Sequence, residues 1–177
     1  DYYWGKMLGR FLTVFIPVFM ALILGVIFGL NKGGDLPWDM IFLYSALLFS
    51  MSFVFLGLAF LLSTLLKSTD VALGSSFVVW IAMLAFIDIA LMGLMLQNRM
   101  SDEMIVAIAM LNPIEVFRTG AISLFDPELT VIGPVAYYVL DTLGNRLLMI
   151  YAIVYPIVVG LLLSYLGYIA FRKKDLL

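Results

Sequence analysis

Few residues in this chain have side chains that could take part in chemistry. Among them, Asp88 has the highest free-energy cost of insertion into a membrane. It is the only charged residue in the apolar stretch 71–96, which is long enough to cross a membrane. Insertion of Asp near the centre of a membrane helix costs roughly 2.5–3.5 kcal/mol, so we expect its side chain to face protein or a cavity. Two roles stay open: a polar group in a translocation path or interfacial switch, or a buried hydrogen bond to a hydroxyl such as Ser50 or Ser52.

Methionine thioethers are the only soft metal ligands, because the chain has no Cys and no His. Met92 and Met95 lie toward the end of the same stretch as Asp88, followed by Met100 and Met104. Thioethers suit Cu(I), but Met is also a flexible filler of apolar cores. We favour packing and predict no metal site. Met92 and Met95 remain, with Asp88, candidates for lining a substrate path.

A second group of polar residues stands in the stretch from Leu111 to Arg118. Glu115 and Arg118 are spaced i, i+3, so one helical face can hold them as an ion pair. Exposed pairs contribute under about 1 kcal/mol, and we interpret this one as orienting its helix. The chain has no nucleotide-binding loop and no H-E-x-x-H zinc motif. No nucleophile–base pair is visible, so we predict neither catalytic activity nor a cofactor in this chain.

Four apolar stretches must position these residues, at about 11–30, 40–66, 71–96 and 147–171. Roughly 20 apolar residues in a helix cross a hydrocarbon core of about 30 Å. Apolar residues make up 64% of the 177 and charged residues only 12%, too few to cover a water-soluble domain. We predict one all-α domain over residues 1–177, a polytopic bundle in the plasma membrane, with no basic patch for nucleic acid. A cleaved signal peptide is disfavoured because the first stretch exceeds the usual 7–15 apolar residues.

The distribution of basic residues predicts the orientation. Lys6, Arg10, Lys67 and the run Arg172–Lys174 fall in short segments at one side, whereas the other side holds most of the acidic residues. The positive-inside rule then places both ends in the cytoplasm. Segment 97–146 lies outside, with interfacial or re-entrant helices around 104–124 and 130–142. A fifth span at 104–123 would put the basic tail outside, against the rule.

Small residues and prolines in the spans predict how the helices pack. Gly25-x-x-x-Gly29 and Gly160-x-x-x-Ser164 each place small residues on one helix face, which allows close helix approach within the chain or at a dimer contact. Pro17 and Pro156 lie inside spans and predict kinks.

Three sequence features carry a resemblance to a known family. They are Gly5-Lys6 before the first stretch, the pattern Asn112-Pro113-x-Glu115-x-Phe117-Arg118, and the ending Phe171-Arg172-Lys173-Lys174. Together they resemble the permease subunits of type-2 ABC exporters, the ABC-2 family, over nearly the whole chain. The outer Asn-Pro pattern is most similar to permeases associated with multicopper enzyme maturation, such as the Nos-type permease. In that family Gly-Lys precedes the third of six spans, so two spans and a coupling helix would come before this sequence.

The resemblance implies a permease that pairs with a separate ATPase, which binds the ATP, and that works as a homodimer in the lipid bilayer. Lys6, Arg10, Lys67 and Asp70 would be secondary contacts on the ATPase side. Copper is disfavoured as the substrate because the chain has no Cys and no His. A sulfur species and an organic molecule are equally admissible as substrates. The alternative function is a non-transporting membrane scaffold or anchor for an extracytoplasmic partner. A passive channel is less favoured, because no ring of charges or filter-like sequence is present.

Overall fold

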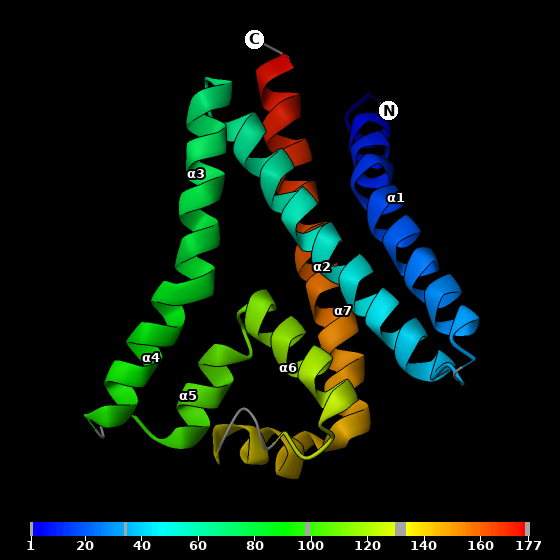
Figure 1. The fold of residues 1–177 in the computed structure, drawn as a ribbon. Helices are drawn as coiled ribbons and strands as arrows, with labels where there is room; N and C mark the ends of the chain where they lie inside the picture. The colour runs from blue at the N-terminus through cyan, green and yellow to red at the C-terminus, as the bar shows by residue number, and fades with distance from the viewer. Residues whose placement is uncertain (1, 34, 98–99, 130–133, 176–177) are drawn as a thin grey trace.

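The computed structural model describes residues 2–33, 35–97, 100–129 and 134–175, and helices dominate them. In chain order these are α1 (Tyr2–Asn31), α2 (Trp38–Leu65), α3 (Thr69–Ile81), the π-helix η1 (Ala82–Phe86), α4 (Ile87–Leu96), α5 (Asp102–Ala109), α6 (Pro113–Phe125) and α7 (Pro134–Asp175) (Figure 1). Helices long and apolar enough to cross a membrane cover Tyr2–Asn31, Trp38–Leu65, Thr69–Leu94 and Val139–Lys174. The predicted polytopic helical bundle with four spans is therefore confirmed.

The first and last spans begin earlier than predicted, the last at Val139, and the third span is not one regular helix. The first helix begins at Tyr2, well before residue 11, because the interfacial residues ahead of the apolar stretch continue the same helix. The third span is built from α3, η1 and α4 in succession. Both ends of the described chain lie at the same end of the molecule as the α2–α3 junction (Figure 1), as an even number of crossings requires.

Helices α2 and α7 form the tightest pair in the molecule. A Cβ atom added at Gly57 of α2 would lie 2.6 Å from the Gly160 carbonyl oxygen and 2.9 Å from Ser164 Oγ. The close packing predicted for Gly160 and Ser164 is confirmed, and it occurs within the chain. Van der Waals contact between close backbones is a principal force holding helices together in lipid.

Helix α1 is attached mainly through its first third, where its buried side chains are Tyr3, Met7 and Phe11. The Tyr3 hydroxyl donates a hydrogen bond to the Ser164 carbonyl oxygen at 3.0 Å, which joins α1 to α7. Within the chain Gly25 makes no close helix contact, because a Cβ there would meet no atom within 4 Å, whereas a Cβ at Gly29 would lie 2.7 Å from the Leu36 side chain. A dimer contact through this face stays a prediction. Gly25 lines an apolar cleft of about 580 Å³ between α1, α2 and the end of α6.

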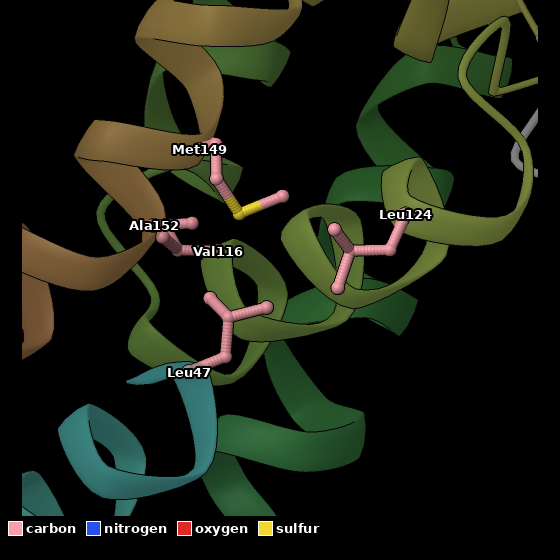
Figure 2. Packing of buried hydrophobic residues seen from close by; sticks show 5 residues of the cluster. All are labelled: Leu47, Val116, Leu124, Met149 and Ala152. Atoms are coloured by element: carbon pink, nitrogen blue, oxygen red, sulfur yellow. The ribbon is translucent and has the colours of Figure 1, made fainter. Parts of the chain in front are cut away.

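The segment between the third and last spans forms a re-entrant hairpin. The helical segments Glu103–Ala109 and Pro113–Phe125 are bent by 100° across a short break. Figure 1 shows α5 rising to the middle of the molecule and α6 returning to the end from which α5 started. The expected helix around 104–124 is therefore two helices that do not cross. Figure 2 shows how α6 is held: Val116 and Leu124 pack with Leu47 of α2 and with Met149 and Ala152 of α7.

Helix α7 has two parts that meet at Gly144. This residue has φ 69° and ψ 159°, a conformation that glycine adopts readily and other residues rarely do. The part before Gly144 lies across the end of the bundle and the part after it crosses the molecule (Figure 1). The first part corresponds to the interfacial helix expected around 130–142. Helix α7 continues through Pro156 and α1 continues through Pro17, and the non-helical backbone angles within α7 occur at Gly144. The kinks predicted at the two prolines stay a prediction.

Candidate functional site at the tip of the hairpin

Asn112 sits at the turn between α5 and α6 and makes hydrogen bonds in two directions. Its Oδ1 accepts from the Ile114 backbone N–H at 3.1 Å, which caps the start of α6. Its Nδ2 donates to the Met83 carbonyl oxygen at 2.6 Å, which joins the hairpin to η1 in the third span. Asn112 is only 3% exposed, so these bonds form away from solvent. Pro113 follows at the first helical position, where its missing N–H has no cost.

The π-helix η1 explains why the third span can accept a bond from Asn112. A π-turn pairs each carbonyl with the fifth residue onward, as the bond from the Ile87 N–H to the Ala82 carbonyl shows. Such turns disturb the regular pairing of backbone groups and frequently occur at functional sites. Here the Met83 carbonyl finds its partner on the hairpin. The irregular turn and the hairpin tip therefore satisfy each other's polar groups.

Two tyrosines of α7 hold the tip from the opposite side. The Tyr151 hydroxyl donates to the Met110 carbonyl oxygen at 2.8 Å, and the Tyr155 hydroxyl donates to the Leu111 carbonyl oxygen at 2.5 Å. Met110 caps the end of α5 and Leu111 follows it, so both carbonyls lie where a helix has run out of backbone partners. An unpaired carbonyl is costly in a membrane, and each hydroxyl supplies one of these carbonyls with a donor.

A three-residue ion cluster lies one turn along α6 from this tip. Arg118 Nη1 is 3.2 Å from Asp88 Oδ2, and Arg118 Nη2 is 2.5 Å from Glu115 Oε2. The predicted Glu115–Arg118 pair is confirmed, but Glu115 is buried rather than exposed. The expectation that Asp88 bonds to Ser50 or Ser52 is wrong. Those hydroxyls donate to carbonyls of their own helix, a common alternative for serine in a span.

The three side chains differ in their exposure. The side chain of Glu115 is 9% exposed, that of Asp88 30% and that of Arg118 49%. Burial raises the pKa of the Glu115 carboxyl to about 7, and the positive charge of Arg118 opposes this shift while Asp88 adds to it. Glu115 Oε1 has no hydrogen-bond partner. The cluster therefore combines an exposed cation with a carboxyl that is poorly satisfied when ionised.

The remaining predicted residues divide between this site and other surfaces. Phe117 is partly buried and packs against the apolar core that contains Leu47 and Val116. Met92 is 64% exposed on α4, and its place in a substrate path stays a prediction. The side chain of Met95 lies outside the part of the chain that the structure describes.

The four candidate ATPase contacts are far from the hairpin along the molecule. Lys6, Arg10, Lys67 and Asp70 are all exposed. They belong to the start of α1 and to the α2–α3 junction, which Figure 1 places at the end where the chain termini lie. The structure thus brings these residues to one end of the bundle. Their role as contacts stays a prediction.

Sequence reasoning missed Tyr151, Tyr155 and Gly57. The tyrosines are spaced i, i+4, so both hydroxyls point from one face of an otherwise apolar span, and buried tyrosine hydroxyls usually have a partner. That spacing was an available signal. Gly57 has no second small residue four positions away in its helix, so no motif marks it.

The described residues thus form a polytopic helical membrane protein with a polar-tipped hairpin packed among its spans. Comparison with known families agrees: residues 1–176 match the model of the ABC-2 family transporter proteins, and the chain belongs to that family. It is thus a permease subunit of an ATP-binding cassette transporter, a transmembrane subunit that is not itself catalytic and that pairs with an ABC ATPase. No curated protein and no solved structure matches the chain.

Proposed function

We propose that this chain is the permease of an exporter, that it works as a homodimer, and that its hairpin and third span line the substrate path. The half-exposed ion cluster carries this proposal. Asp88 lies eight residues before the end of α4, about 12 Å along the helix. A charged side chain facing lipid at that depth is costly. The exposed side of Arg118 therefore meets either a water-filled path or a second copy of the chain.

The packing supports a division into fixed and moving parts. Helices α2 and α7 approach backbone to backbone at Gly57 and Gly160. Helices α3 and η1, by contrast, have no buried residues at all. The third span packs lightly against α2 and α5, and its polar links to the hairpin are made by Asn112 and Arg118. ATP-driven closure of the ATPase would tilt this span against the α2–α7 pair, with η1 as the hinge beside Asp88.

The orientation of the chain follows from its basic residues. Lys67 and Lys173 lie at the end of the molecule that we assign to the cytoplasm, and Lys32 lies at the opposite end. Because the chain has no Cys, single cysteines report cleanly on sidedness. A membrane-impermeant maleimide should label Lys32→Cys in intact cells and Lys173→Cys only after permeabilisation. The reverse pattern would invert the proposed topology and remove the ATPase contact from this end.

The decisive experiment is purification of the full-length protein in mild detergent. We expect an ATPase without membrane spans to copurify, and its ATP hydrolysis to change when both are reconstituted in lipid. Lys67→Glu should weaken the association, whereas Lys32→Glu, the same charge change at the other end, should not. If no ATPase associates, the function as a scaffold or anchor for an extracytoplasmic partner replaces the exporter.

The substrate is proposed only as a class. The outer stretch from Asn112 to Arg118 is similar to that of permeases linked to multicopper enzyme maturation, which favours a role in a maturation system. The absence of Cys and His from the sequence argues against copper as the passenger. Transport assays with reconstituted vesicles should therefore begin with sulfur compounds rather than with copper salts.

A further inference from the structure

Two carboxyl groups share one guanidinium at the contact between the hairpin and the third span. Arg118 donates to Asp88 with one terminal nitrogen and to Glu115 with the other. If both acids are ionised, the cluster has an excess of one negative charge. That charge falls on Glu115, whose second oxygen, Oε1, is buried and has no donor. A buried carboxylate oxygen without a donor is strongly unfavourable.

The described surroundings offer no other cation to this oxygen. On its own helix Glu115 faces Arg118, and from α4 it faces Asp88. Helix α2 has one charged residue, Asp39, in its first turn. On α7, Arg146 is exposed, and the hydroxyls of Tyr151 and Tyr155 donate to carbonyls of the hairpin tip. On α5, Glu103 is exposed at the start of the helix, away from the tip.

We infer that Glu115 is a proton-binding site, and that the proton it holds fastens the re-entrant hairpin to the third span. With a proton on Oε1, the cluster is neutral and the buried oxygen becomes a donor, with the Asp88 carboxylate as the neighbouring acceptor. Loss of the proton leaves a buried negative charge that draws Arg118 away from Asp88. Because Asp88 belongs to α4 and the other two to α6, this exchange loosens the contact between the two elements.

A proton fits this place better than a metal ion. The guanidinium already stands between the two carboxyls, so a cation would be repelled by it. Among the described residues no group of three acidic or metal-binding side chains occurs. The raised pKa of Glu115, caused first by burial, agrees with the geometry. The inference concerns the chain alone and stands whether or not it exports a substrate.

The test is an infrared titration of the full-length protein in lipid nanodiscs, from about pH 5 to about pH 9. We expect the carbonyl stretch of a neutral carboxylic acid to disappear with a midpoint near pH 7. Glu115→Gln should remove this band. Glu103→Gln, which changes an exposed carboxyl in the same hairpin, should leave it in place.

Two further variants keep Glu115 and change the charge beside it in opposite directions. Asp88→Asn removes a negative charge and should lower the midpoint, and Arg118→Gln removes a positive charge and should raise it, each by roughly one pH unit. These opposite shifts decide the matter even if Glu115→Gln does not fold. A band that survives Glu115→Gln, a cluster fully ionised near pH 6, or shifts of the same sign in both neighbour variants would overturn the proton site.

Discussion

The contact between Gly57 and Gly160 allows a stability prediction with a worked magnitude. A methyl group at Gly57 would lie 2.6 Å from the Gly160 carbonyl oxygen, and a carbon–oxygen pair is comfortable near 3.5 Å. The backbone of α7 would therefore have to recede by roughly 1 Å along its tightest contact with α2. Overfilling a packed core typically costs about 1–3 kcal/mol. The gain in helix propensity on replacing glycine by alanine, about 0.5–1 kcal/mol, offsets only part of this.

Gly57→Ala should accordingly lower the free energy of unfolding by about 1–2 kcal/mol. The measurement is the midpoint of unfolding in mixed detergent micelles. The loss of helix is monitored by circular dichroism as the fraction of denaturing detergent is raised. Gly74→Ala is the matched control, because a Cβ at Gly74 meets nothing within 4 Å and Gly74 also lies inside a helix. The control should be as stable as the parent or slightly more so. Equal stability of the Gly57 and Gly74 variants would refute the assignment of α2–α7 as the close-packed pair.

Three further predictions concern the hairpin and its supports. Tyr155→Phe removes the donor to the Leu111 carbonyl and should lower the free energy of unfolding by about 1 kcal/mol. In the Leu111→Cys background it should also increase the reactivity of the cysteine toward maleimide. Unchanged reactivity would count against the bond. Gly144→Ala forces a residue with a Cβ to φ 69° and should cost about 1–2 kcal/mol in thermal unfolding, whereas Gly93→Ala, at an open helical position, should not. Asp88→Asn should impair transport or coupled ATPase activity at normal expression, and unimpaired activity would give Asp88 a structural role only.

The four spans could be predicted from the sequence because the bilayer core requires a long, almost uncharged helix. Long apolar stretches have few other uses, and the charged residues between them mark their ends. Local information also indicated a helical segment around 104–124 that does not span, although its division into the two helices α5 and α6 was not predicted. Residues 104–111 are too short to span, and Asn112-Pro113 interrupts the apolar stretch. These inferences hold since each depends on a short window of sequence.

The partners of the polar residues could not be predicted in the same way. Asp88 and Arg118 are 30 positions apart, and only the fold brings them together. Ser50 and Ser52 were poor candidates because a serine hydroxyl in a helix can always bond to its own backbone. Gly25 makes the same point for packing within the chain, where no atom lies within 4 Å of its Cβ position. A small residue permits close approach, but whether another helix arrives there depends on the remaining contacts of both helices.

The contact between the third span and the rest of the bundle depends mainly on polar groups, in contrast to the apolar core. Helices α2, α6 and α7 share an apolar core in which Leu47 and Val116 are fully buried, and such contacts do not respond to charge or protonation. The third span has almost no share in that core. It is joined to the hairpin by the Asn112–Met83 hydrogen bond and by the ion cluster, which are directional and sensitive to charge. A change in charge at this contact can therefore alter the position of one span without loosening the rest of the bundle.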